Sequence, residues 1–294
     1  MTDLAAGNRA EAIIEPTGLA DFLRRFVRNQ RAVLGTAIVA AVALTAALSP
    51  WLAPADYART NMAFVWEPPG AEFVLGTDAL GRDVLSRLIV GARVSLLVAV
   101  SVLAFAMAAG VAAGMAAAWR GGWIDSLITR GADITFAFPE LIVAILVAAM
   151  MGPGIPTVVV SLSLVGWPGI ARIVRSLVLS LRHELFVDAA IVCGTSGVRI
   201  LLRHCLPNIV PALIVRASVG VGFVVMAEAT LSFLGLGVQE PLPSWGGMIR
   251  DGLTSLRTDP HLALTASLCL GVTIVGFNLL GDALRDLLDP RIRD

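Results

Sequence analysis

Long runs of apolar residues, separated by short polar segments, dominate the 294-residue chain. A helix that crosses the hydrocarbon core of a bilayer needs roughly 20 mostly apolar residues. Six runs approach that length with few charges. They predict six transmembrane helices at residues 33–51, 94–118, 134–151, 158–177, 209–231 and 262–280. The expected fold is therefore all-α, that of a polytopic membrane protein.

Two of the segments outside these runs have patterns of their own. Residues 22–28 combine apolar and basic side chains, which suits a helix lying along an anionic inner leaflet or a simple orientation anchor. Residues 53–93 follow the first run and contain the stretch Glu67-Pro68-Pro69-Gly70. Pro and Gly at this density predict irregular structure, and a short helix is expected after it, from Asp83 to Ile89.

Composition agrees with a membrane protein and excludes an ordinary soluble domain. Hydrophobic residues make up 57% of the chain, charged residues only 15%, and the mean hydropathy is +0.82. The formal net charge is zero, so no excess of basic surface indicates a nucleic-acid partner.

The chain contains no Lys, and all 22 of its Lys-plus-Arg positions are Arg. A P-loop needs a Lys to reach the phosphates of a nucleotide. Any ATP-driven work is therefore expected to come from another polypeptide, with no cofactor bound by this chain.

Catalytic and metal-binding patterns are missing from the sequence. Cys193, Cys205 and Cys269 stand far apart without a His cluster, so neither a metal site nor a disulfide framework is expected. No Ser and His pair or paired acids within a span suggests an intramembrane enzyme. Paired broken helices and inverted repeats, which would favour an ion-coupled secondary transporter, are not apparent either.

The distribution of Arg predicts the orientation, because cytoplasmic loops carry an excess of positive charge. With the N-terminus inside, most of the 22 Arg fall in the cytoplasmic segments. Both termini are therefore expected in the cytoplasm, and residues 182–208, between the fourth and fifth spans, face the same side.

This cytoplasmic segment carries the motif most informative about function. It contains Asp188-Ala189-Ala190, then Gly194, and further on His204 and Leu206-Pro207. Small Ala side chains let another protein approach the backbone closely, Asp188 favours a helix start, and Gly194 permits a sharp turn before a second helical piece ending at Pro207. The segment is expected to dock a partner protein.

The pattern resembles the EAA loop of binding-protein-dependent permeases of ATP-binding-cassette importers. Asp188 stands where the family usually has Glu, and His204 where Ile is commoner. Three further segments resemble the C-type subunits of dipeptide, oligopeptide and nickel importers. They are residues 75–83 with Ser86-Arg87, residues 228–237, and residues 281–291.

The resemblance implies a type I importer permease in the bacterial inner membrane. Its expected partners are a B-type second permease, two ATPase subunits or domains that bind ATP and Mg²⁺, and an extracytoplasmic substrate-binding protein. The EAA loop, with Asp188, Ala189, Ala190, Gly194, His204, Leu206 and Pro207, would couple the chain to the ATPases. Peptides are the expected cargo, with nickel or another small solute as the alternative.

The same comparison suggests a division of the chain. Residues 1–32 would form a cytoplasmic segment, and residues 33–92 the first transmembrane helix with an extracytoplasmic segment. Residues 93–282 would form the permease domain, and residues 283–294 a cytoplasmic tail.

Two groups of charged residues are candidates for work outside the coupling loop. Ionisable residues inside a span usually face a cavity or a partner, which makes Glu140 and Glu228 candidates for the transport pathway. Glu140 could instead reach the headgroups or cap a broken helix. In the external segment, Asp78, Arg82 and Asp83 could contact the binding protein, gate the outer mouth, or form the solvated face of a short interfacial helix.

Overall fold

The computed structural model describes residues 19–288, which form helices, loops and a single isolated β-bridge between Thr77 and Asp83. The predicted all-α class is confirmed. The α-helices are α1 Leu19–Arg28, α2 Gln30–Ala47, α3 Ser49–Leu52, α4 Val84–Arg120, α5 Gly122–Phe136, α6 Glu140–Met151, α7 Ile155–Leu181, α8 Leu185–Val192, α9 Gly197–Ile200, α10 Leu206–Phe233, α11 Trp245–Leu253 and α12 His261–Leu288. A 3₁₀ turn covers Met62–Phe64 and a π-helical turn covers Leu201–Cys205.

Five helical stretches in the described part of the chain are each long and apolar enough to cross a membrane. They are α2, α4, α7, the continuous stretch Gly197–Phe233 that ends in α10, and α12. The helices α5 and α6 pass the same test only as a bent pair, which gives six spans if the pair counts as one.

The third predicted span, residues 134–151, is wrong as a straight helix. It covers the last residues of α5 and all of α6, which meet at an angle of 91°. Pro139 stands at the break, immediately before α6. A Pro has no N–H to donate and disfavours a helical residue before it, so the chain turns at this point.

The predicted short helix from Asp83 to Ile89 is also wrong as a separate element. Asp83 is the N-cap of α4, and its carboxylate accepts a hydrogen bond from the Ser86 N–H at 2.8 Å. At 1.5 Å per residue, the 37 residues of α4 span about 55 Å, far beyond a hydrocarbon core of roughly 30 Å. The boundary expected between residues 92 and 93 falls inside this helix.

Close packing of α4 against α7 depends on two glycines one turn apart. A Cβ on Gly110 would lie 2.6 Å from the Cβ of Ile170, and a Cβ on Gly114 would lie 2.5 Å from the carbonyl oxygen of Ala171. Small residues at this spacing let transmembrane helices approach without intervening side chains. The two helices therefore form the closely packed centre of the molecule.

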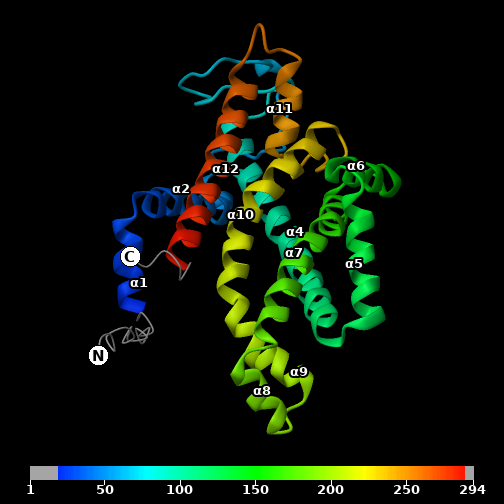
Figure 1. Cartoon of the computed structure of the whole chain (residues 1–294). Helices are drawn as coiled ribbons and strands as arrows, with labels where there is room; N and C mark the ends of the chain where they lie inside the picture. The colour runs from blue at the N-terminus through cyan, green and yellow to red at the C-terminus, as the bar shows by residue number, and fades with distance from the viewer. Residues whose placement is uncertain (1–18, 289–294) are drawn as a thin grey trace, which may run out of the picture.

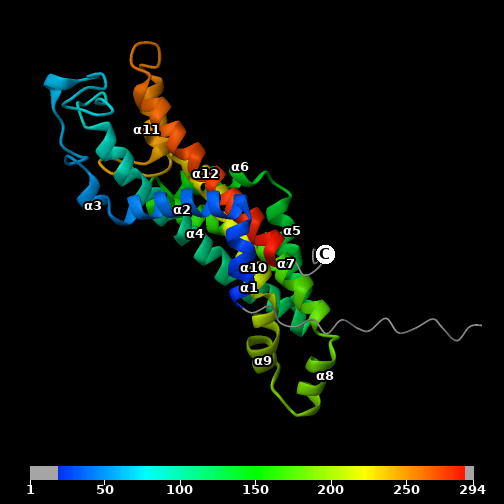
Figure 2. The same ribbon diagram turned by 90° about the vertical axis from the view of Figure 1, so that its left-hand side faces the viewer.

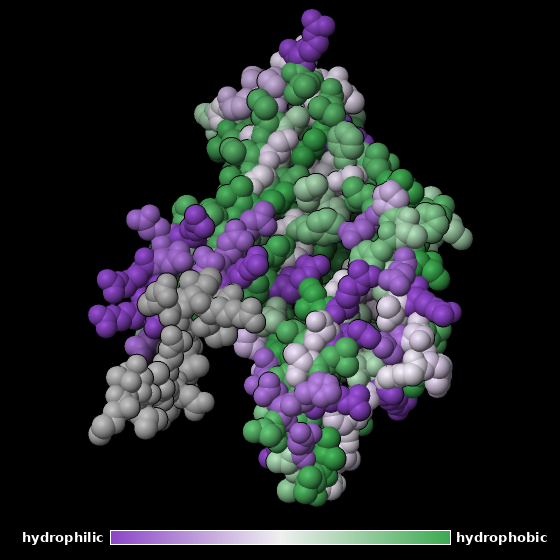
Figure 3. Space-filling view, in the orientation of Figure 1, coloured by the Kyte–Doolittle hydropathy of each residue, from purple (hydrophilic) through white to green (hydrophobic). Residues whose placement is uncertain are grey.

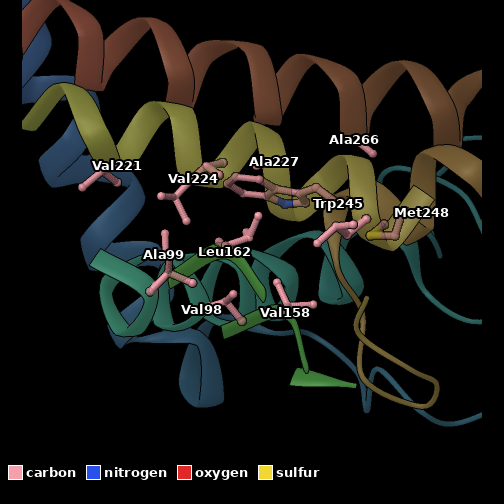
Figure 4. Packing of buried hydrophobic residues seen from close by; sticks show 14 of the residues in the cluster. Val98, Ala99, Val158, Leu162, Val221, Val224, Ala227, Trp245, Met248 and Ala266 are labelled. Atoms are coloured by element: carbon pink, nitrogen blue, oxygen red, sulfur yellow. The ribbon is translucent and has the colours of Figure 1, made fainter. Parts of the chain in front are cut away.

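A larger hydrophobic core joins α4, α7, α10, α11 and α12, and Figure 4 shows its side chains turned toward a shared interior. Trp245 is the largest fully buried residue, and its indole N–H donates to the carbonyl oxygen of Leu88 at 3.2 Å. This bond satisfies the one polar group of the Trp side chain.

The molecule is elongated, with the helical spans between two non-spanning ends (Figures 1 and 2). At one end lie α11 and the loops between α3 and α4, and at the other end α8 and α9 project beyond the spans. Figure 3 shows hydrophobic side chains over α10, α11 and α12 and again at the tip formed by α8 and α9.

Candidate functional site

Residues 182–208 form a helical hairpin at the projecting end. Asp188 lies in the first turn of α8, and Gly194 turns the chain with φ of +74°, a conformation that few residues other than Gly adopt. Two hydrogen bonds close the turn, from the Gly194 N–H to Ile191 O at 2.9 Å and from the Thr195 N–H to Ala190 O at 3.0 Å. The sharp turn expected at Gly194 is confirmed.

The second half of the hairpin differs from its expected form. A separate helical piece ending at Pro207 was expected, but α9 passes through the π-helical turn into α10 without a break. Pro207 is the second residue of α10, which directly follows the π-helical turn, a kind of bulge that occurs within α-helices. His204, in the π-helical turn, is half-buried, as is Leu206 at the start of α10. The hairpin is thus continuous with a membrane-spanning helix.

Large apolar side chains are exposed on this hairpin. Leu185 is 84% exposed, Val192 86% and Val198 66%. Asp188 and Ala189 are exposed beside them, whereas Ala190 is half-buried. Apolar side chains grouped on a projecting tip indicate a protein-binding surface.

The hairpin is attached firmly to the end of α4. Val187 and Ile200 are fully buried in a second hydrophobic cluster, which includes Val174 and Val178 of α7. A Cβ on Gly197 would lie 2.2 Å from the indole nitrogen of Trp119, so the hairpin backbone rests directly on that ring. A force applied to the tip would reach α4, α7 and α10 together.

At the opposite end, Asp78 and Arg82 belong to a buried network of charges. The Arg82 Nε donates to Asp78 Oδ2 at 2.6 Å, and its two terminal nitrogens bind both carboxylate oxygens of Glu240. Arg87 lies 3.3 Å from both Asp78 and Glu240. The network joins the loop between α3 and α4 to the loop between α10 and α11.

The solvated interfacial helix expected here is wrong, because Asp78, Arg82 and Asp83 are only 2%, 4% and 7% exposed. Buried, these side chains present almost no surface to a docking protein, and their role at the outer mouth stays a prediction.

The charges in this network shift the pKa values of Glu240 and Arg82. The hydrogen bond from Arg82 holds the pKa of Glu240 below its usual value. Burial alone would lower the pKa of Arg82, but the bond to Glu240 and the charge of Asp78 outweigh it and raise the pKa.

Glu228 lies inside the bundle, fully buried between α4 and α10. Its carboxyl accepts hydrogen bonds from Ser95 Oγ at 2.9 Å and Ser232 Oγ at 2.7 Å. Both partners belong to this chain, an arrangement that favours a role in joining α4 to α10. A pathway role for Glu228 stays a prediction.

Glu140 is the first residue of α6 and is exposed at the bend after Pro139. It lines a cavity enclosed by α4, α6, α7 and α10, together with Arg216. Sequence reasoning did not bring Arg216 into this site. The pathway role of Glu140 stays a prediction.

Other residues of these sites also escaped the sequence interpretation. Glu240 completes the charge network, and Trp119 supports the α8–α9 hairpin. Glu240 carried a usable signal, since it is the only acid between Glu228 and Asp251. Trp119 carried none, because an aromatic residue near the end of an apolar run is also typical of a membrane interface.

Multiple spans, a projecting hairpin with an apolar tip and an opposite end of folded loops define a multi-pass transport permease rather than a soluble protein. The chain belongs to the family described as binding-protein-dependent transport system inner membrane component, whose model matches residues 110–294. A second model, the N-terminal TM domain of oligopeptide transport permease C, matches residues 18–69. It is a permease subunit of an ATP-binding-cassette importer, as its motifs predicted.

Curated relatives cover almost the whole chain. The dipeptide transport system permease protein DppC of Alkalihalophilus pseudofirmus is 38% identical over 92% of this chain and 89% of its own length. The glutathione transport system permease protein GsiD of Shigella flexneri is 41% identical over 93% of this chain and 90% of its own length. The same-named protein of Escherichia coli O157:H7 is 39% identical over the same shares.

Proposed function

We propose that this chain forms half of a translocation pathway for short peptides and that its α8–α9 hairpin docks in an ATPase subunit. The observation that carries the proposal is the hairpin itself. It presents Leu185, Val192 and Val198 at its tip, while Val187 and Ile200 fix its base to the spanning helices. A rigid base under an apolar tip suits the transmission of movement from one protein to another.

The relatives support a peptide as the cargo. Their names specify a dipeptide and glutathione, which is itself a small peptide. We infer that this chain carries cargo of the same class, peptides of two or three residues. Nickel or another small solute has no comparable support among these relatives.

The complete transporter would contain a second permease, two ATPase subunits or domains and an extracytoplasmic binding protein. ATP and Mg²⁺ would bind to the ATPases, and this chain would act as a transport subunit without enzymatic activity. Six spans would return the chain to its starting side, in agreement with two cytoplasmic termini. The described residues begin and end near one another, since α1 contacts α12.

Reconstitution of the complete transporter tests the proposal. Proteoliposomes holding both permeases and the ATPases, with binding protein outside, are expected to accumulate labelled Ala-Ala only when ATP is present at the ATPases. Uptake by this chain without any ATPase would instead favour an ion-coupled secondary transporter. Failure of the complete complex to take up peptide, with a nickel complex accumulated instead, would contradict the peptide assignment.

A further inference from the structure

Arg216 lies within the membrane-spanning part of α10, about 15 Å along that helix from Leu206 at 1.5 Å per residue. It is only partly exposed and lines the cavity among α4, α6, α7 and α10. An ionised side chain within a spanning helix is costly and usually faces a cavity or a partner. Its place in the structure is therefore a functional question.

Other Arg residues near this region have acidic partners, and Arg216 does not. Arg172 pairs with Asp133 at 2.8 Å, and Arg175 pairs with Asp125 at 2.5 Å. Among the described residues 19–288, no carboxylate lies within ion-pair distance of Arg216. Its guanidinium is therefore free to bind an anion from outside the chain.

Two glycines leave room around the Arg216 guanidinium. A Cβ on Gly169 of α7 would lie 3.9 Å from Nη2, and a Cβ on Gly220 of α10 would lie 3.4 Å from Nη1. The 3.9 Å at Gly169 is an ordinary van der Waals distance, so a small side chain fits there, whereas a side chain at Gly220 would press on Leu103, 3.1 Å away, and on the guanidinium. The planar group that forms paired bonds with carboxylates therefore lies against glycine positions of α7 and α10.

The cavity is suited to a small polar group. Its volume is about 60 Å³, above the roughly 10–15 Å³ that one water needs but too small for a whole dipeptide. Apart from Glu140 and Arg216 its walls are mostly apolar, with Leu103, Leu162 and Phe223 among them. In such surroundings a bond between guanidinium and carboxylate is stronger than in water.

We propose that Arg216 binds the terminal carboxylate of a peptide during its passage, with the rest of the peptide outside the cavity. The proposal rests on the peptide transport proposed above and adds the part of the peptide that this chain recognises. Glu140 lines the same cavity but is itself exposed, so an amino group left outside the cavity can face it. Its charge disfavours simple inorganic anions and suits a zwitterion.

A reporter thiol beside the guanidinium tests the proposal directly. Gly169→Cys places sulfur next to Arg216, in a complete complex in which Cys193, Cys205 and Cys269 are replaced by Ser. The reaction rate of this thiol with a neutral alkylating reagent is measured with and without millimolar Ala-Ala. Ala-Ala is expected to slow the reaction at least fivefold, whereas alanylalaninamide, which lacks the carboxylate, leaves the rate unchanged.

Variants of Arg216 separate binding from folding. Arg216→Gln is expected to abolish the protection by Ala-Ala, and Arg216→Lys to retain part of it. Arg172→Gln, which removes a paired Arg, serves as the matched control and is expected to keep full protection. The proposal would be overturned by equal protection from the dipeptide and its amide, or by protection that survives in Arg216→Gln. A thiol that does not react, or that Ala-Ala does not protect, would also overturn it.

Uptake of Ala-Ala by the unmodified transporter distinguishes failure of the proposed carboxylate site from failure of the proposed peptide transport. Import of Ala-Ala without protection that depends on Arg216 would overturn the carboxylate site alone. Absence of import would contradict the peptide function on which the site rests.

Discussion

Charged residues in the loops of this permease have different partners from those inside its helical bundle. In the outer loops, Arg82 links Asp78, four residues before it in the chain, to Glu240, 158 residues after it. In the bundle, Glu228 is held by two hydroxyls, and Arg216 has no ionic partner among the described residues. The paired groups are expected to govern stability, and the unpaired one transport.

Removal of Arg82 tests the structural role of the outer network. Arg82→Gln leaves buried Asp78 with the longer contact to Arg87 as its ionic partner, beside the backbone N–H groups of residues 80 and 82. We expect a loss of about 3 kcal/mol, at the low end for a broken buried pair because Glu240 is partly exposed. Denaturant unfolding of the purified permease complex measures the loss. Unchanged stability, with weaker docking of the binding protein, would indicate a docking role instead.

The lowered pKa of Glu240 makes the outer network sensitive to acid. A carboxylate whose pKa is lower when folded contributes stability that is complete above its unfolded pKa of about 4.3. That contribution disappears as the pH falls through the lower folded pKa. The melting temperature of the wild-type complex is therefore expected to fall below about pH 4 more steeply than that of Glu240→Gln. Parallel curves for the two proteins would contradict this assignment.

At the scale of elements, glycines decide how close helices come and where the chain turns. Gly114 lets α4 touch α7, and Gly194 turns the coupling hairpin with a positive φ. Around Gly194 no atom lies within 4 Å of an added Cβ, so its requirement is conformational. Gly114, by contrast, is needed for space.

Matched Ala substitutions test the requirement for space. Gly114→Ala would put Cβ 2.5 Å from Ala171 O and is expected to destabilise the complex by about 1–3 kcal/mol. Gly271→Ala in α12 has open space and is expected to be neutral or stabilising by up to about 1 kcal/mol. Thermal unfolding in detergent measures both changes. Equal effects of the two substitutions would contradict the account of α4–α7 packing.

Substitutions at Gly194 test the turn of the coupling hairpin. Val disfavours a positive φ strongly, whereas Asn tolerates it. Gly194→Val is expected to reduce peptide-stimulated ATP hydrolysis at least fivefold, and Gly194→Asn to reduce it less than twofold. The amount of permease in the membrane serves as the folding control. Normal stimulated hydrolysis in Gly194→Val would contradict the assignment of this hairpin as the coupling element.

Local sequence pattern predicted the helices better than it predicted their junctions. The apolar runs identified all the spans because a bilayer imposes a length and polarity on each one. The bend of 91° after α5 was missed, since Pro139 signals a break but not its direction. The outer network was missed because it forms only when two distant loops meet. The place of Arg216 was missed for the same reason, as its cavity is made by four helices.

At the scale of the whole molecule, the two ends of an elongated helical body face different compartments. The coupling hairpin projects at one end, and the folded loops with α11 lie at the other (Figure 2). Between them, α4, α7 and α10 run through the body and pack on one another. Because the hairpin continues directly into α10, movement of an ATPase docked there as proposed would have a rigid path toward the other end.

The sidedness of the hairpin tests this account most directly, and native Cys193 provides the probe because it is exposed in the turn after α8. In a Cys205→Ser, Cys269→Ser variant of the complete complex, a membrane-impermeant maleimide is applied to inside-out vesicles and to intact cells. We predict labelling of Cys193 only from the cytoplasmic side, and slower labelling when the ATPase subunits are bound. Labelling from the outside, or a rate that the ATPase does not change, would contradict the account.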